Sequence, residues 1–271
     1  MKVNNTVWVV TGSGNGMGRA MALALLHKGA KVAAVDLNEA ALHETRELAG
    51  ELQDRISLHV LNITDRAAAE ALPDQLIDRY SKVDGLINNA GIIQPFVRIN
   101  DLDYAVIEKV LNVNFYGLLY MTKAFLPHLL LRPEAHIVNI SSMGGFLPVP
   151  GQSIYGATKA GVKLMTEGLR AELSDTHVHV TVVFPGAMET NIIVNSGAQN
   201  PDKPLPNAED ARFKPLSPAK AAQIILKGIE KNKSRIFVGK DSRFLDWMYR
   251  LSPSLATNLV AKQIKAHDLI E

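Results

Sequence analysis

Residues 6–18 read TVWVVTGSGNGMG and predict a strand, a tight turn and the start of a helix. The apolar and β-branched run at 6–10 predicts the strand, and helical spacing over 17–27 ends at Gly29. Glycines in the turn let the backbone bend sharply and let a phosphate approach the N–H groups at the helix N-terminus. Their spacing is T-G-x-x-x-G-x-G rather than G-x-G-x-x-G. The stretch favours a dinucleotide site, with a plain glycine-rich turn as the alternative.

The alternation of strand and helix continues along the chain. Further strands are expected at 31–35, 56–61, 83–87, 136–140, 178–184 and 235–238, and helices at 42–52, 65–80, 103–131, 155–173 and 217–229. Most of these strands are apolar throughout, which is typical of a parallel sheet with helices on both faces. We therefore expect an α/β fold, with one domain at 1–239 and a C-terminal amphipathic helical extension at 240–271.

Composition excludes several classes of protein. Of the 271 residues, 47% are hydrophobic and 21% charged, which are values of a globular chain. The chain has no cysteine, so it has no disulfides and no thiolate metal site, and a net charge of +2 gives no reason to expect nucleic-acid binding. No apolar run is long enough for a transmembrane helix, and the N-terminus lacks a signal-peptide pattern. We therefore expect a cytoplasmic protein. We also expect no metal site, since His177 and His179 have no adjacent carboxylate in the sequence.

Two segments depart from the regular pattern. Residues 187–215 contain four prolines and little periodicity, and are predicted to form a mobile substrate loop. In the extension, apolar residues at 244, 247, 248 and 251 form one helical stripe, and Ser252-Pro253 starts a second helix with apolar residues at 255, 259, 260 and 264. Basic residues accompany both helices. Three roles are possible for the extension: it packs on the core or on a neighbouring subunit, it closes the substrate pocket as a lid, or it lies on a membrane surface. The membrane alternative is not favoured.

Asp36 ends the second predicted strand, 18 residues after Gly18. A carboxylate at this place accepts hydrogen bonds from ribose hydroxyls and repels a 2′-phosphate. Alternatively, Asp36 caps the helix that follows it. Because no basic residue flanks Asp36 and residue 15 is Asn, we expect NAD rather than NADP.

Tyr155 and Lys159 are four residues apart and share one face of a predicted helix. A nearby cation lowers the pKa of a phenol, which makes it usable as an acid or base near neutral pH. Ser142 lies 13 residues before Tyr155, where its hydroxyl is available to a substrate oxygen. Asn114 lies in a predicted helix interior, where Asn is unfavourable, so we expect a specific role or a local kink there. The alternatives are a chance Y-x-x-x-K spacing and an exposed helical Asn.

Taken together, the motifs resemble those of the short-chain dehydrogenase/reductase family over residues 5–240. They are Thr11–Gly18, Asn88-Asn89-Ala90-Gly91, Asn114, Ser142, Tyr155 with Lys159, and Pro185-Gly186 with Thr190, in the family's order. The resemblance implies a Rossmann-like, doubly wound sheet of about seven parallel strands. It also implies that Tyr155 is the general acid/base, that Lys159 binds the nicotinamide ribose and lowers the pKa of Tyr155, that Ser142 orients the substrate, and that Asn114 holds a proton-relay water.

The same resemblance implies a set of cofactor contacts. These are Gly12, Ser13, Asn15, Gly16, Met17, Gly18, Asp36, Leu37, Asn62, Ile63, Asn89, Ala90, Gly91, Tyr155, Lys159, Pro185, Gly186, Met188 and Thr190. Asn62 departs from the family pattern, which usually has Asp at this adenine contact.

We therefore expect NAD-dependent hydride transfer to or from an alcohol or ketone. The alternatives are an NADP(H)-dependent ketoreductase and a dinucleotide-binding regulator without turnover. An apolar substrate is suggested by Phe146, Leu147, Val149, Met188, Ile192, Ile193, Val194 and Phe213. A homodimer or homotetramer is expected because the family pairs two long helices, and the first carries apolar Leu118, Leu119, Met121, Phe125 and Leu129.

Overall fold

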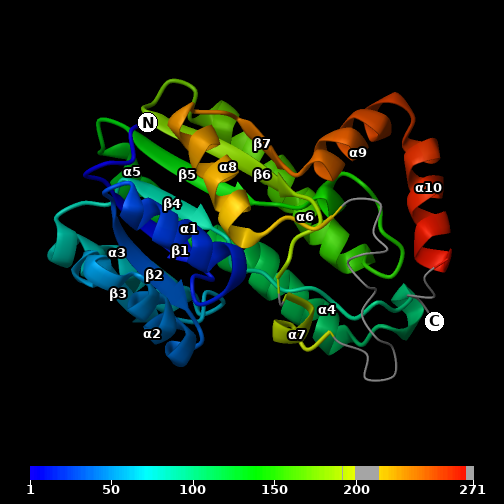
Figure 1. Ribbon diagram of the computed structural model, residues 1–271, viewed down its shortest axis with the longest axis horizontal. Helices are drawn as coiled ribbons and strands as arrows, with labels where there is room; N and C mark the ends of the chain where they lie inside the picture. The colour runs from blue at the N-terminus through cyan, green and yellow to red at the C-terminus, as the bar shows by residue number, and fades with distance from the viewer. Residues whose placement is uncertain (191, 199–213, 267–271) are drawn as a thin grey trace.

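Seven apolar segments pair edge to edge in the computed structural model, which describes residues 1–190, 192–198 and 214–266 (Figure 1). The strands are β1 (Val7–Thr11), β2 (Lys31–Asp36), β3 (Ile56–Val60), β4 (Gly85–Asn88), β5 (Ala135–Ile140), β6 (Val178–Pro185) and β7 (Arg235–Val238). They lie in the order β3-β2-β1-β4-β5-β6-β7, and every neighbouring pair is parallel. The predicted Rossmann-like parallel sheet is confirmed.

The chain reverses its direction across the sheet between β1 and β4. It moves outward from β1 through β2 to β3, and then returns to place β4 on the other side of β1. At such a point the loops that follow the two strands diverge and leave a crevice at their carboxyl ends. The glycine-rich turn follows β1 and residues 89–94 follow β4, so the two segments meet at this crevice.

Helices cover both faces of the sheet. They are α1 (Gly16–His27), α2 (Glu39–Leu48), α3 (Arg66–Tyr80), α4 (Tyr104–Leu111), α5 (Leu118–Leu130), α6 (Ser153–Glu172), α7 (Ile192–Asn195), α8 (Pro218–Glu230), α9 (Lys240–Leu251) and α10 (Pro253–Ala266), with short turns η1 (Gly50–Arg55), η2 (Ile99–Asp101), η3 (Asn112–Gly117) and η4 (Met143–Gly145). Buried side chains of α1, α2 and α8 pack on one face, and those of α3 and α5 on the other.

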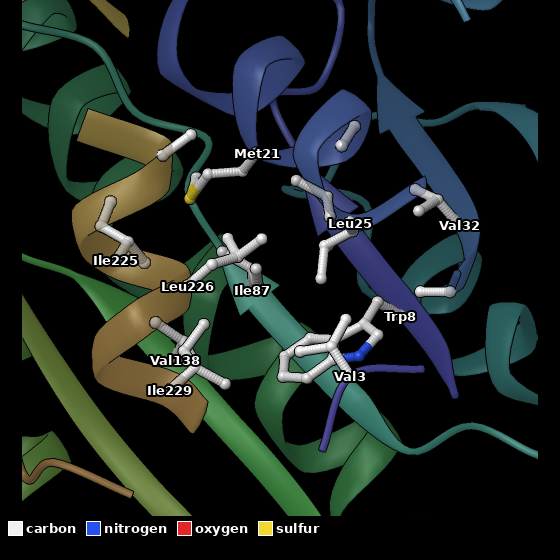
Figure 2. Close-up of a cluster of buried hydrophobic side chains, with 14 of the residues drawn as sticks. Val3, Trp8, Met21, Leu25, Val32, Ile87, Val138, Ile225, Leu226 and Ile229 are labelled. Carbon is white, nitrogen blue, oxygen red and sulfur yellow. The ribbon is translucent and has the colours of Figure 1, made fainter. Parts of the chain in front are cut away.

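Figure 2 shows the core between α1 and α8. Met21 of α1 points toward α8, which contributes Leu226 to the same cluster, and Trp8 of β1 lies beside Val3. The next residue, Val9, belongs to the cluster on the opposite face, because successive side chains of a strand point to opposite faces. A Cβ on Gly85 of the neighbouring strand would overlap the indole ring, so this glycine makes room for Trp8.

The single helix predicted over 103–131 is interrupted. The π-helical turn η3 separates α4 from α5, and Asn114 is buried within it. Turns of this kind are frequent at functional sites. The helix predicted over 42–52 also ends early, at Leu48, and the 3₁₀ turn η1 follows it.

The two predicted helices of the extension are present as α9 and α10, and α10 begins at Pro253 as expected. Their apolar stripe is only partly used, however. Met248 is buried, in a cluster with Leu147, whereas Trp247 is 60% exposed and Leu251 is 67% exposed. Figure 1 shows α10 at the outer edge of the molecule, far from the sheet. Packing onto the core therefore involves one side of α9 and not the whole stripe.

The expected loop at 187–215 contains a short helix, α7, and a bridge between Met188 and Leu216. Residues 191 and 199–213, including Phe213, and residues 267–271 lie outside the described part of the chain. Within the described residues, no helix is long and apolar enough to cross a membrane. The same residues contain no group of three or more side chains placed to hold a metal. His179 does have a carboxylate neighbour, since Glu134 lies 3.2 Å from its ring.

Candidate active site

The turn after β1 has the shape that its glycines allow. Gly12 and Gly16 have φ values of +66° and +51°, which L-residues with a side chain rarely adopt. A Cβ on Gly18 would overlap the carbonyl oxygen of Gly12, so a side chain here would force turn and helix apart. Asn15 caps α1, and its side chain accepts the N–H of Gly16 at 2.6 Å.

A cleft of about 890 Å³ opens at the carboxyl ends of the strands. This volume lies within the ~300–1,000 Å³ range of small-molecule sites. The cleft runs from the glycine-rich turn and β2 past the end of β4 to Tyr155 and Pro185. One cavity thus joins the predicted nucleotide and reaction ends.

Most predicted site residues line this cleft. They are Gly12, Asn15, Gly16, Met17, Asp36, Leu37, Asn62, Ile63, Asn89, Ala90, Gly91, Ser142, Tyr155, Lys159, Pro185, Gly186, Met188 and Thr190. Ser13, Gly18 and Asn114 are absent from the lining. Ser13 is buried and donates its hydroxyl hydrogen to the carbonyl of Val35, so it secures the turn to β2. The lining also includes residues that sequence reasoning missed, among them Asn38, Lys109 and Asn195.

The Asp36 side chain anchors the glycine-rich turn. Its two carboxylate oxygens accept the N–H of Gly14 at 2.8 Å and the N–H of Asn38 at 3.0 Å. The alternative role as a helix cap is wrong, because Asn38 is the residue that caps α2, by accepting the N–H of Ala41. The carboxylate is therefore fixed at the edge of the cleft.

A basic side chain that sequence reasoning missed lies close to the turn. Arg19 of α1 donates to the carbonyl of Gly14 and forms an ion pair with Glu44 at 2.6 Å. The guanidinium lowers the pKa of the Glu44 carboxyl. Arg19 is four residues from Asn15 along the chain, and only the helical turn brings it back to Gly14.

Asparagines after β3 and β4 shape the rest of the nucleotide end. Asn89 donates to the carbonyls of Thr11 and Gly12 at 3.0 and 3.2 Å, so it ties the end of β4 to the glycine-rich turn. Asn62 accepts the N–H and the hydroxyl of Thr64 through one oxygen. That oxygen is therefore engaged, and the amide nitrogen of Asn62 is the atom available to a ligand.

Tyr155, Ser142 and Lys159 come together at the other end of the cleft. The Ser142 side chain lowers the pKa of the Tyr155 phenol, and its hydroxyl accepts the N–H of Gly144 at 3.1 Å. The Lys159 Nζ lies 5.9 Å from the centre of the Tyr155 ring and donates to the carbonyl of Ile140 at 3.0 Å. The structure thus brings together three groups, from the segment after β5 and from α6, that the sequence pattern linked.

Burial dominates the electrostatics of these groups. It raises the pKa of the Tyr155 phenol, and the hydrogen bond with Ser142 opposes that rise. It lowers the pKa of Lys159 to about 8. Lys159 was expected to lower the Tyr155 pKa; in this structure the net shift is upward and the lowering contribution comes from Ser142.

Asn114 lies behind the cleft wall rather than in it. Its oxygen accepts the N–H of Ile92 at 2.8 Å, and its nitrogen donates to the carbonyl of Ile92 at 2.9 Å and to Thr158. A Cβ on Gly91 would lie 3.2 Å from both the Asn114 oxygen and the Lys159 Nζ, so this glycine allows their approach. The water expected at Asn114 stays a prediction.

The extension reaches the site through Asp241, which sequence reasoning missed. Its carboxylate accepts the N–H of Ala187 at 2.6 Å, and a Cβ on Gly186 would overlap both of its oxygens. The neighbouring Ser242 donates to the carbonyl of Phe184 at 2.8 Å. The first turn of α9 therefore holds the Pro185-Gly186 turn in place, and the sequence does not indicate this contact because the burial of Asp241 is visible only in the structure.

The expected apolar pocket is only partly formed. Met188 and Ile192 line the cleft. Phe146, Leu147 and Val149 instead pack against α9 and α10, because the chain after η4 turns toward the extension. Val194 is 53% exposed.

Known proteins resemble this chain in sequence and in structure. A family model of short chain dehydrogenases matches residues 6–201. The Mycobacterium tuberculosis protein SadH, named as an oxidoreductase, is 37% identical over 259 residues, which cover 94% of each chain. Among solved structures, a short chain dehydrogenase/reductase from Burkholderia phymatum in complex with NAD has a TM-score of 0.79 and 25% identity, covering 88% of this chain and 90% of the other. A short chain dehydrogenase from Burkholderia cenocepacia in complex with NADP also has a TM-score of 0.79 and 25% identity, covering 96% and 99%.

Proposed function

This chain is an oxidoreductase of the short-chain dehydrogenase family, and on that premise we propose that it transfers a hydride between NAD(H) and the carbinol or carbonyl carbon of an apolar secondary alcohol or ketone. The observation that carries the proposal is the meeting of Ser142, Tyr155 and Lys159 in the cleft that the glycine-rich turn opens. A pure nucleotide-binding regulator has no need of a phenol and a serine hydroxyl that meet in the cleft, so we disfavour that alternative.

The residues at the nucleotide end fit a dinucleotide. The φ-positive glycines and the start of α1 suit a pyrophosphate, Asp36 suits a ribose diol, and Asn62 and Ile63 suit an adenine ring. Lys159 and Tyr155 would hold the second ribose, and Pro185, Gly186 and Thr190 would flank the nicotinamide. When bound, the nicotinamide supplies the acceptor or donor of the hydride.

The protein's own groups would handle the proton. Because burial raises its pKa, the Tyr155 phenol keeps its proton near neutral pH and suits the acid role toward a carbonyl oxygen. In the reverse direction Tyr155 takes the proton of a substrate hydroxyl, and the Lys159 ammonium would stabilise the phenolate. The Ser142 hydroxyl would bind the same substrate oxygen and orient it.

NADP(H)-dependent ketone reduction is the second candidate. Arg19 beside Gly14 is the observation that favours it, since a guanidinium suits a 2′-phosphate. Glu44 already neutralises Arg19, and the Asp36 carboxylate would repel a 2′-phosphate. We therefore favour NAD.

The remaining features of the proposal concern assembly and surroundings. We propose a homodimer or homotetramer in the cytoplasm, but not through four of the five residues first considered. Leu118, Met121, Phe125 and Leu129 are buried within the chain. Tyr104, Tyr116 and Leu164 on α4, η3 and α6 are exposed by 82%, 45% and 70%, so these side chains are available for pairing.

The test is turnover of purified protein with NAD or NADP and a panel of apolar alcohols, followed by the absorbance band of the reduced nicotinamide; ketones are assayed with NADH and NADPH. We expect turnover with NAD(H) and a higher kcat/KM than with NADP(H). Binding of NADH without turnover of any alcohol or ketone would favour the regulator instead.

A further inference from the structure

A buried pair of glutamines joins the segment after β4 to the start of α6. Gln94 is 1% exposed and Gln152 is 4% exposed. The Gln152 side chain donates to the backbone carbonyl of Gln94 at 2.7 Å, and the Gln94 side chain donates to the carbonyl of Gly151 at 3.0 Å. The two segments, 58 positions apart in the chain, are therefore cross-linked inside the protein.

Gln94 also satisfies the first turn of α6. Its side-chain oxygen accepts the N–H of Ile154 and the N–H of Tyr155, both at 3.0 Å. N–H groups in the first turn of a helix have no acceptor within the helix itself. The local cap residue, Gln152, makes no side-chain capping hydrogen bond. A residue 61 positions away thus supplies the acceptor that a Ser or Asp cap normally provides.

The segment that carries Gln94 is itself anchored on either side of the cleft. Asn114 holds both backbone polar groups of Ile92, and the N–H of Ile93 donates to the Ser196 hydroxyl at 3.0 Å. Three successive residues therefore fix the segment to η3, to the end of α7 and to α6. Gln94 transmits that fixed position to the backbone of Tyr155.

We propose that Gln94 is a positioning residue for Tyr155, which it serves by capping the turn that carries the phenol. The inference rests on the proposed function, because it assumes that Tyr155 moves the proton. A general acid must lie within hydrogen-bond reach of its substrate oxygen, ~2.6–3.2 Å. Displacement of about 1 Å can cost ~10²-fold in rate. Loss of the two capping hydrogen bonds from Ile154 and Tyr155 frees this turn to move, while the nucleotide end of the cleft stays intact.

Three variants separate the cap from the rest of the cross-link. Gln94→Met keeps the side-chain volume and removes the acceptor. Gln94→Glu keeps an acceptor for both N–H groups, removes the donor to Gly151 and introduces a carboxyl group at a buried position. Gln152→Met is the matched control, because it breaks the reciprocal hydrogen bond and leaves the cap in place. Each variant is assayed for kcat, KM, NADH affinity and thermal unfolding.

We expect Gln94→Met to lower kcat by about 10- to 100-fold, with the Kd for NADH within about threefold of wild type. Gln94→Glu and Gln152→Met should both retain kcat far better. The inference is overturned if Gln94→Met keeps kcat within twofold of wild type, if its Kd for NADH rises as much as kcat falls, or if Gln94→Glu is as slow as Gln94→Met. If Gln94→Met fails to fold, the comparison of Gln94→Glu with Gln152→Met decides. A kcat of Gln94→Glu close to that of Gln152→Met supports the cap, whereas a kcat tenfold lower than that of Gln152→Met contradicts it.

Amide hydrogen exchange over residues 152–158 tests the cap without any turnover. We expect faster exchange in Gln94→Met and near wild-type exchange in Gln94→Glu, and equal exchange in all variants would contradict the cap. Absence of wild-type turnover with either nicotinamide would instead contradict the proposed function. The exchange rates would then still decide whether Gln94 holds the turn of Tyr155.

Discussion

Helices α1 and α6 both begin beside the cleft, but their first turns are satisfied in different ways. At α1 the local residue Asn15 accepts the N–H of Gly16, and the neighbouring Met17 lines the cleft. At α6 the distant residue Gln94 accepts the N–H groups of Ile154 and Tyr155. The start of α1 is therefore suited to receive an anion, whereas that of α6 is closed by protein and suited to hold a side chain still. Under the proposed function, the start of α1 binds the cofactor and the start of α6 positions the Tyr155 phenol.

The largest expected effect is at α6. Replacement Tyr155→Phe removes the phenol hydroxyl from the cleft, so kcat should fall by ~10²–10⁴-fold. The Kd for NADH should change little, because the nucleotide end is built on β1, β2 and α1. Steady-state kinetics and NADH fluorescence titration measure the two quantities. A variant that keeps more than about a tenth of wild-type kcat would refute the acid/base role.

At the α1 side, Asp36→Ala should change cofactor choice rather than rate. Loss of the ribose contact and of the repulsion toward a 2′-phosphate should shift the NAD/NADP preference by on the order of 2–4 kcal/mol. The measurement is kcat/KM with each cofactor for wild type and variant. Wild-type kinetics that already favour NADP would contradict the role given to Asp36.

The charge state of Lys159 gives a pH-dependent test of the buried end. Its pKa is about 8 in the folded protein and ~10.4 in an unfolded chain, so the unfolded state binds more protons between these values. The free energy of unfolding contributed by this group should therefore rise with pH from about 8 to 10, by a few kcal/mol at most. Above pH ~10 the raised pKa of Tyr155 acts in the opposite direction.

Lys159→Met should remove the rise between pH 8 and 10. Urea unfolding of wild type and variant over this range measures it. An unchanged slope in the variant would show that other groups cause the dependence.

The smallest expected effect compares one glycine in each helix. Gly18→Ala in α1 forces a Cβ onto the carbonyl of Gly12, and should lower the free energy of unfolding by ~1–3 kcal/mol and weaken NADH binding. Gly168→Ala in α6 meets no atom within 4 Å, and should raise that free energy by up to ~1 kcal/mol. Chemical denaturation measures both. Equal effects of the two substitutions would contradict the close packing of the α1 turn.

Local sequence was sufficient for most of the fold because the strands of a parallel sheet are apolar runs and their helices have a distinct period. It was less informative where tertiary contacts override local preference. The Asn at position 114 of a predicted helix interior indicated a specific role or a local kink, but nothing in residues 103–131 shows that the kink is a π turn. The apolar stripe of α9 likewise predicts burial of Trp247, which the structure leaves 60% exposed.

What the sequence alone determined is the chemistry at single positions and short spacings. Glycines with positive φ, a carboxylate at the end of β2 and the i, i+4 pair of Tyr155 and Lys159 are properties of neighbouring residues. Only the tertiary structure decided how those groups are held. Gln94 reaches α6 and Asp241 reaches Ala187 across 61 and 54 positions, and such contacts depend on which chain ends the sheet brings together. The raised pKa of Tyr155 was likewise decided by the tertiary structure. Burial raises it, and the spacing of residues in the sequence does not show which groups the fold buries.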